Sequence, residues 1–190
     1  MDYGLLTNFF LHYQLKHVSL TIRYSSFAGD ENSMPFSGEV RERIKEIVSK
    51  YETKQSALIP VLKEVQRQHG WLSQESMIEV AELLEIPPSS VQNVATFYTM
   101  FFTKPVGKHI VWLCRTLPCA LRGAEQIEHY ISEKLGVHTG ETTADGKITF
   151  LEAECLASCG TAPVMLVDDD LYENLTKGKI DELIEKLKKG

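Results

Sequence analysis

The residues best suited to chemistry in this sequence of 190 residues are its four cysteines, which all lie in the second half of the chain. Cys114 and Cys119 form a C-x4-C pair, and Cys155 and Cys159 form a C-x3-C pair. Four cysteines are too few for a disulfide scaffold at this length, and the first residues show no basic segment leading into an apolar run, as a secretory signal would. We therefore expect reduced thiols in a reducing compartment.

Two close pairs separated by 35 residues are compatible with three kinds of chemistry. Four thiolates can bind one zinc ion in a tetrahedral site, which would make the protein a zinc-stapled interaction module. A dithiol can cycle with its disulfide, although the efficient redox motif C-x-x-C matches neither pair. Four thiolates can also bind the two irons of a [2Fe–2S] cluster. Spacing alone leaves these alternatives open, together with four unrelated buried cysteines.

The residues around the two pairs favour the cluster. Cys114 directly follows the segment HIVWL and Cys155 follows KITFLEAE, so both pairs are expected at strand ends, where the loops of an α/β sheet converge. Gly160 removes a side chain where the backbone has to approach a cluster. Pro118 and Pro163 stiffen the two loops, which would keep the cluster geometry fixed.

Histidines and acidic residues outside the pairs are weaker candidates. His69 and His109 could ligate a Rieske-type cluster, but four cysteines make them unnecessary, and packed or surface histidines are common. The acidic run 168–170 lacks the spacing of a calcium loop, so we interpret it as a solvated turn rather than a cation site. Together with Glu152 and Glu154, this run is expected to lower the potential of the cluster, because reduction adds negative charge.

Helical periodicity characterises the first half of the chain. Apolar residues at spacings of three and four predict four helices within residues 39–102. Ser37 and Ser73 are the expected N-caps of the first and third helix. Ser89 or Ser90 is expected to cap the fourth helix, which follows two prolines.

From residue 105 the pattern changes to that of an α/β unit. The expected elements are a strand at 109–113, a helix at 122–135, a strand around 148–152, a hairpin at 164–172 and a last helix at 178–188. The predicted fold class is α+β. Its expected parts are an N-terminal extension at 1–36, a helical bundle at 37–104 and an α/β domain at 105–190.

Composition and charge exclude several classes of protein. The net charge of −6 offers no broad basic surface for nucleic acid. The longest uncharged stretch, 86–103, contains prolines and polar residues and falls short of the roughly 20 apolar residues of a membrane span. We therefore expect neither nucleic-acid binding nor membrane insertion. Large apolar side chains are dense in this stretch, and some should cover the second domain or a partner: Phe97, Tyr98, Met100, Phe101 and Phe102.

Four segments, in this order, carry a resemblance to a known family. They are SALIPVLKEVQRQHGWLS (56–73), IPPSSVQNVATFYTMF (86–101), CRTLPCALRG (114–123) and CLASCGTAPVM (155–165). Over about residues 38–188 the sequence closely resembles the 24 kDa [2Fe–2S] subunit of NADH:quinone oxidoreductase, the respiratory complex I of bacteria.

This resemblance implies a fold, a cofactor and partners. The fold would be a helical bundle followed by a thioredoxin-like [2Fe–2S] ferredoxin domain. One [2Fe–2S] cluster would be bound by the cysteines at the motif positions, Cys114, Cys119, Cys155 and Cys159. The cluster would exchange single electrons with the FMN of a neighbouring subunit that also binds NADH, in a complex with further iron–sulfur subunits. The protein would then be cytoplasmic, at the inner face of the cell membrane.

Similar subunits also occur in soluble NAD-linked hydrogenases and formate dehydrogenases. The four motifs are shared by these assemblies, so the resemblance does not distinguish them. The expected terminal electron acceptor therefore stays open at this point.

Residues 1–33 depart from the family and lack helical or strand periodicity, whereas Met34 begins a segment like an ordinary family start. We predict that these residues are dispensable, being either disordered or not translated, because segments without buried faces tolerate truncation. The intact mass of the protein isolated from its own cell tests this prediction. A main species that begins at Met34 is expected, and one that begins at Met1 counts against an internal start.

Overall fold

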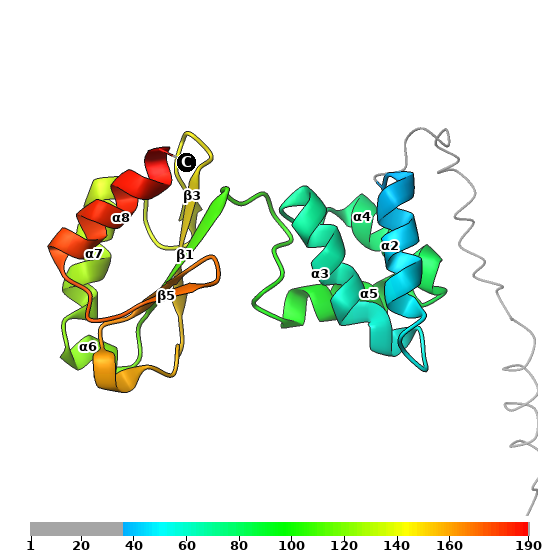
Figure 1. Cartoon of the computed structure of the whole chain (residues 1–190), viewed down its shortest axis with the longest axis horizontal. Coiled ribbons are helices and arrows are strands. Elements are labelled where there is room, and N and C mark those ends of the chain that lie inside the picture. The colour runs from blue at the N-terminus through cyan, green and yellow to red at the C-terminus, as the bar shows by residue number, and fades with distance from the viewer. Residues whose placement is uncertain (1–35, 190) are drawn as a thin grey trace, which may run out of the picture. The chain divides into compact units, whose positions relative to one another are not determined.

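A computed structural model of the protein describes residues 36–189 (Figure 1). Its elements form a helical region that ends with Phe97 and an α/β region that begins at His109. The predicted extension lies outside the described residues except for Phe36, which is buried in the core of the helical region. The domain boundary between residues 104 and 105 stays a prediction.

The helical region contains the four predicted helices. They are α2 (Gly38–Val48), α3 (Leu58–His69), α4 (Gln74–Leu84) and α5 (Pro88–Phe97), with the short 3-10 helix η2 (Gln55–Ala57) before α3. The Ser37 and Ser73 hydroxyls accept hydrogen bonds from the N–H groups of the third residue after each, as expected for N-caps. The predicted cap of α5 is wrong: the helix already begins at Pro88, so Ser89 and Ser90 lie in its first turn. Proline favours this first helical position because its φ angle is fixed and its missing N–H needs no partner.

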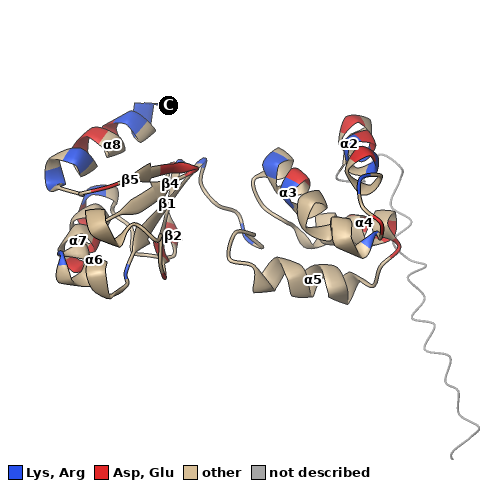
Figure 2. Ribbon diagram, turned by 60° about the horizontal axis from the view of Figure 1, so that its bottom comes forward, with Lys and Arg blue, Asp and Glu red and all other residues tan. Residues whose placement is uncertain are grey.

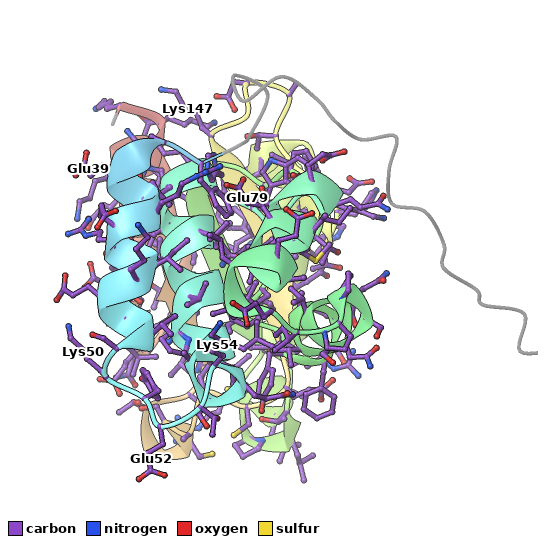
Figure 3. All side chains as sticks on the ribbon, turned by 90° about the vertical axis from the view of Figure 1, so that its right-hand side faces the viewer. Glu39, Lys50, Glu52, Lys54, Glu79 and Lys147 are labelled. Atoms are coloured by element: carbon purple, nitrogen blue, oxygen red, sulfur yellow. The ribbon has the colours of Figure 1, made fainter. Side chains whose placement is uncertain are left out.

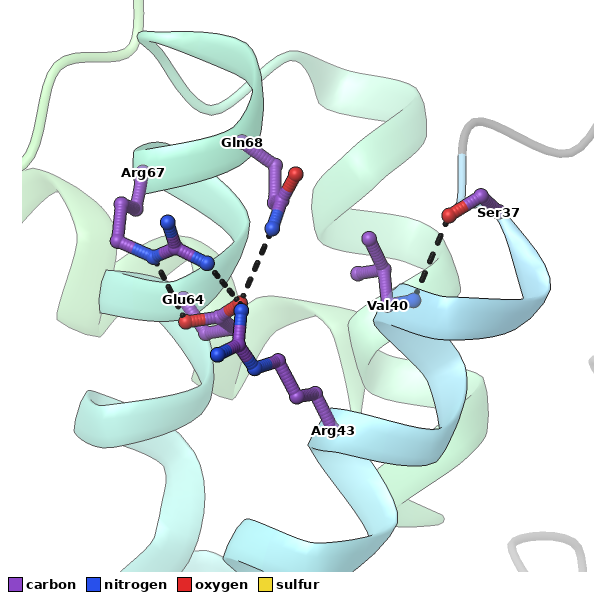
Figure 4. A network of polar contacts seen from close by, with 6 residues as sticks. All are labelled: Ser37, Val40, Arg43, Glu64, Arg67 and Gln68. Carbon is purple, nitrogen blue, oxygen red and sulfur yellow. Dashed lines mark hydrogen bonds and ion pairs between the residues drawn. The ribbon is translucent and has the colours of Figure 1, made fainter.

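Apolar side chains from all four helices fill the core of the helical region. Polar side chains join the helices around it: Arg41 of α2 pairs with the buried Glu79 of α4. Arg43 of α2 and Arg67 of α3 both contact the Glu64 carboxylate (Figure 4). Figure 3 shows the contrast between Glu79, which lies among the helices, and charged residues such as Glu39, Lys50 and Glu52 at the surface.

The α/β region is built on a five-stranded sheet with the order β2-β3-β1-β4-β5. The strands are β1 (His109–Cys114), β2 (Glu141–Thr142), β3 (Ile148–Ala153), β4 (Met165–Val167) and β5 (Asp170–Tyr172). β1 pairs with β3 in parallel, and all other pairs are antiparallel. The predicted strands and hairpin are therefore confirmed, whereas the two-residue β2 was not predicted.

Two helices pack on one face of this sheet. They are α7 (Ala124–Leu135) and α8 (Lys177–Lys189), which lie side by side in Figure 1. Their apolar residues form one core with the strands, in which Phe150 of β3 and Ile180 of α8 are fully buried. Two short helices flank the strand ends: α6 (Leu117–Leu121) follows β1, and the 3-10 turn η3 (Cys159–Thr161) precedes β4.

The surface charges are unevenly distributed over the described residues. α5 carries neither basic nor acidic side chains, whereas α2 and α8 carry both (Figure 2). Of the dense apolar group in and after α5, Phe101 is buried, but Phe97, Tyr98 and Met100 are exposed. Within residues 36–189, every helix is too short or too polar to cross a membrane.

Gly107 fixes the entry of the chain into β1. A Cβ atom at this position would stand 2.8 Å from backbone atoms of Ile148 in β3, which cannot move without disturbing the sheet. The Gly107 N–H also donates a hydrogen bond to the buried Thr149 hydroxyl at 2.6 Å. We predict that Gly107→Ala lowers the free energy of unfolding by about 1–3 kcal/mol, the usual cost of overpacking.

A second glycine provides the matched control. A Cβ at Gly178 in α8 would meet open space, so Gly178→Ala should be neutral or stabilise by up to about 1 kcal/mol. Urea unfolding followed by Trp112 fluorescence in a Trp71→Phe background measures both variants. Equal stabilities of the two alanine variants would contradict the close approach of Gly107 to β3.

Candidate metal centre

Cys114 is the last residue of β1 and is only 2% exposed. Its Sγ lies 3.3 Å from the Thr116 hydroxyl oxygen and 4.0 Å from the Glu154 carbonyl oxygen. Burial by itself would raise the pKa of the Cys114 thiol, but hydrogen bonds from Thr116 and from the Leu156 backbone outweigh it and lower the pKa. The lowered pKa favours the thiolate, which is the form of cysteine that binds metal.

Cys119 lies beside Cys114 on the short helix α6 and is 1% exposed. Burial and the neighbouring Cys114 thiol raise the pKa of Cys119, and the charge of Cys159 adds to this effect. A hydrogen bond from the Val164 backbone acts in the opposite direction. The two buried thiols therefore differ, and Cys114 loses its proton more readily.

Small apolar residues close around the buried pair. The cluster consists of Cys114, Cys119, Ala124, Ala162 and Val164, with Leu156 packed against it. The Cys114 N–H donates to the Val164 carbonyl at 3.1 Å, which ties the end of β1 to the segment before β4. The buried pair is thus fixed by a strand, a helix and their packing.

Cys155 and Cys159 lie on the segment between β3 and β4, and both are exposed. This segment contacts the buried pair, because the Glu154 carbonyl and the Leu156 backbone, which flank Cys155, both interact with the Cys114 thiol. The structure therefore brings the two pairs to one edge of the sheet. One pair is buried there and the other lies at the surface.

The acidic residues differ in their distance from this edge. Arg115, the residue after Cys114, forms ion pairs with Glu152 at 3.3 Å and with Glu154 at 3.6 Å. These two glutamates are therefore near the site but partly neutralised. The expectation that the acidic run 168–170 also acts on the site is wrong, because Asp168 binds His109 at the other end of β1. Five residue steps along a strand span roughly 16 Å.

The histidine candidates lie elsewhere. His109 contacts Asp168 through its Nδ1 at 2.8 Å at the start of β1, and the His69 ring stacks on Phe36. Asp168 and Asp169 form the expected turn between β4 and β5, and Asp170 is the first residue of β5. Among residues 36–189, no three His, Cys, Asp or Glu side chains are arranged around a single metal-ion position.

Some parts of the site were missed by sequence reasoning. The short helix α6, which carries Cys119, was not predicted, although Pro118 near its start is a signal for a helix N-terminus. The role of Thr116 had no signal beyond its position two residues after Cys114. A Cβ at Gly160 would meet no protein atom within 4 Å, so crowding by the protein does not explain this glycine.

The residues present fit a [2Fe–2S] cluster. Both segments offer thiols in short pairs, which is the ligand set that such a cluster uses. Backbone N–H groups also face the sulfur atoms: that of Ala157 donates to Cys155 Sγ at 3.4 Å, and those of Leu156 and Val164 donate to Cys114 and Cys119. Such donors stabilise negative charge on sulfur.

Comparison with known families decides the relationship. Residues 44–188 match the family of thioredoxin-like [2Fe-2S] ferredoxins. The chain belongs to this family. The fold class inferred from the sequence, a helical region followed by a thioredoxin-like α/β region, is confirmed.

Two relatives of this thioredoxin-like ferredoxin are similar over most of its length. It is 46% identical over 147 residues to the E subunit of the NADH-quinone oxidoreductase of Rickettsia bellii. The aligned residues cover 76% of this chain and 88% of the relative. It is 37% identical over 190 residues to "NADH dehydrogenase [ubiquinone] flavoprotein 2, mitochondrial" of Dictyostelium discoideum, and this alignment covers 97% of this chain and 77% of the relative. The resemblance inferred from the four segments is therefore confirmed.

A solved structure shares the fold. The ferredoxin chain matches a crystal structure of an NAD+-reducing [NiFe]-hydrogenase in the air-oxidized state with a TM-score of 0.60 and 21% identity. The match covers 67% of this chain but only 22% of the hydrogenase chain. At this identity the likeness shows the fold alone.

The hydrogen bond from Thr116 to Cys114 generates a prediction. Thr116→Val removes a donor to the thiolate, so the pKa of Cys114 should rise, whereas Thr116→Ser keeps the hydroxyl and should leave it low. Titration of thiolate absorbance measures this in a chain whose other three cysteines are serines. Equal midpoints for the valine and serine variants would contradict the role of the hydroxyl.

Proposed function

We propose that this chain is the electron-transfer subunit of an NADH-oxidising complex, NADH:quinone oxidoreductase. It carries one [2Fe–2S] cluster that exchanges single electrons with the flavin of a partner subunit. The names of the relatives from R. bellii and D. discoideum support this proposal. The observation that carries it is the meeting of two cysteine pairs at one sheet edge, in a family of [2Fe-2S] ferredoxins.

The proposed ligands are the four cysteines of the site, Cys114, Cys119, Cys155 and Cys159. Because each pair is separated by few residues, each would close on one iron. The burial of the first pair and the exposure of the second imply an inner iron and an outer iron. The outer side of the site would then be the side that faces a partner.

When bound, such a cluster supplies a one-electron carrier. Hydrogen bonds to the Cys114 thiol lower its pKa against the effect of burial, and the apolar cluster keeps water from the inner pair. The N–H groups of Leu156 and Val164 stabilise negative charge on the inner sulfur atoms. The exposed pair leaves one side of the site open for electron exchange.

A partner subunit has to supply the flavin. Removing hydride from NADH transfers two electrons, whereas a [2Fe–2S] cluster takes one, so a flavin must stand between them. Dinucleotide binding commonly uses a G-x-G-x-x-G turn, and none of the twelve glycines of this sequence forms a G-x-G. We therefore assign FMN and NADH to a partner, followed by further iron–sulfur subunits. The complex would hold the chain at the cytoplasmic face of the cell membrane.

The assembly is the finer part of the proposal. The likeness to the hydrogenase is at 21% identity, whereas the R. bellii relative at 46% identity is a subunit of an NADH-quinone oxidoreductase. We therefore favour the quinone-reducing complex over a soluble hydrogenase or formate dehydrogenase. Purification of the native assembly tests this choice, because a nickel–iron or molybdenum subunit would contradict it.

The ligand assignment predicts the effect of removing a single thiol. Changing any one of the four cysteines to alanine should abolish the cluster, because one iron is left incompletely coordinated. Serine can keep a weakened cluster through its oxygen. Iron and sulfide contents and the visible spectrum after reconstitution measure the result.

The control for this experiment is Ser132→Ala, which removes a hydroxyl from α7 and should keep the full cluster. An alanine variant that retains full iron and sulfide content with an unchanged spectrum would remove that cysteine from the ligand set. A colourless wild-type chain that binds zinc alone would favour the zinc-stapled module.

The need for a flavin predicts that the isolated chain does not oxidise NADH. Mixing the cluster-loaded, flavin-free chain with NADH should leave the cluster oxidised, as followed by its visible absorbance. Adding the flavin subunit should permit electron transfer to an artificial acceptor. Oxidation of NADH by the isolated chain would overturn the assignment.

A further inference from the structure

The exposed cysteine pair lacks the packing that fixes the buried pair. Cys155 and Cys159 are exposed, and the residues between β3 and η3 have no regular secondary structure. Ala157, between the two cysteines, has a φ angle of 58°, in the left-handed region that costs energy for residues other than glycine. Interactions other than burial therefore have to hold this pair in place.

Glu173 binds this segment on both sides of Cys159. It follows directly after β5, and its Oε1 accepts hydrogen bonds from the Ser158 and Thr161 hydroxyls, each at 2.5 Å. Ser158 precedes Cys159, and Thr161 is the last residue of η3. One carboxylate thus binds the turn that carries Cys159 at both of its ends.

Glu173 is itself anchored to the rest of the α/β region. Lys179 of α8 donates from its Nζ to the Glu173 carbonyl oxygen at 2.9 Å. The next residue, Asn174, donates from its N–H to the Thr161 carbonyl at 2.7 Å. The contact of Glu173 with the two hydroxyls, called the clamp below, therefore connects the exposed segment to β5 and α8.

The chemistry of this contact favours a firm hold. The hydroxyls of Ser158 and Thr161 keep the pKa of Glu173 below its usual value, so the carboxylate is ionised at neutral pH. Hydrogen bonds to an ionised acceptor are roughly twice as strong as those between neutral groups. A single charged oxygen can therefore restrain both hydroxyls.

We propose that Glu173 is a positioning residue, which clamps η3 through Ser158 and Thr161 and so holds Cys159 in place as a cluster ligand. The inference rests on the proposed function, because the cluster is what Cys159 would bind. Removing a residue that hydrogen-bonds and orients a metal ligand typically lowers metal affinity or activity by about 10–100-fold. Loss of the clamp should therefore loosen the outer iron.

Glu182 separates the effect of charge from that of positioning. It lines the same surface groove as Glu173 and is likewise exposed, but its carboxylate binds neither of the two hydroxyls. Glu182→Ala therefore removes a negative charge from this surface and leaves the clamp intact. Glu173→Gln removes the charge and keeps a neutral acceptor at the clamp.

The experiment measures the rate of iron release to a chelator and the electron paramagnetic resonance spectrum of the reduced cluster in the full chain. Glu173→Ala and the double variant Ser158→Ala/Thr161→Val should each release iron about ten-fold faster than wild type and show an altered spectrum. Adding Glu173→Ala to the double variant should change little, because the double variant already removes both hydroxyl contacts of Glu173, together with the contact between the two hydroxyls. Glu173→Gln should be intermediate, and Glu182→Ala should match wild type.

Several results would overturn the inference. One is iron release at the wild-type rate with an unchanged spectrum in Glu173→Ala. Another is faster release in Glu173→Ala but not in the double variant, which would show that the effect does not pass through the hydroxyls. An equal effect of Glu182→Ala would show that surface charge alone acts.

The experiment distinguishes failure of the proposed function from failure of the inference about Glu173. If wild type assembles no [2Fe–2S] cluster, the proposed function is contradicted and the inference falls with it. If wild type holds the cluster and the clamp variants match it, only the inference fails. The double variant keeps the test informative should Glu173→Ala not fold.

Discussion

The parallel pairing of β1 with β3 is the constraint on which the rest of the site depends. Its register places Cys114 opposite Ala153. β1 therefore ends at Cys114 of the first pair, and β3 ends two residues before Cys155 of the second pair, at the same sheet edge. The Arg115 N–H extends this pairing by donating to the Ala153 carbonyl at 3.0 Å. Two parallel strands need a long connection, and the crossover through α7 provides it. The cysteine pairs at the ends of β1 and β3 thereby meet without the entropic cost of closing a long unstructured loop.

The same pairing makes the two cysteine pairs unequal. Cys114 and Cys119 take their environment from the sheet and α6, so burial, the Thr116 hydroxyl and backbone N–H groups control their ionisation. Cys155 leaves the sheet after β3 and lies at the surface with Cys159, where side-chain contacts replace packing. A protein that exchanges electrons with a partner needs both properties: a rigid, dry inner side and an accessible outer side. The clamp at Glu173 is how this fold reconciles exposure with order.

Much of the fold could be predicted because periodicity reports which side chains are buried. The four helices of the first half and the main strands of the second half follow from it, and short elements such as α6 and β2 escape it because they hold too few residues to show a period. The cysteine pairs could be found from their spacing. The position of the acidic run at the far end of β1, the hydroxyl of Thr116 and the contact of Glu173 could not, because they depend on which segments meet in three dimensions.

The central claim is that four thiolates from two distant segments bind two irons at one sheet edge, and iron K-edge X-ray absorption of the chain purified from its own cell tests it most directly. We predict a first shell made of sulfur alone and one iron neighbour for each iron. A nitrogen or oxygen ligand in that shell, an iron without an iron neighbour, or a zinc edge in place of the iron edge would contradict the account.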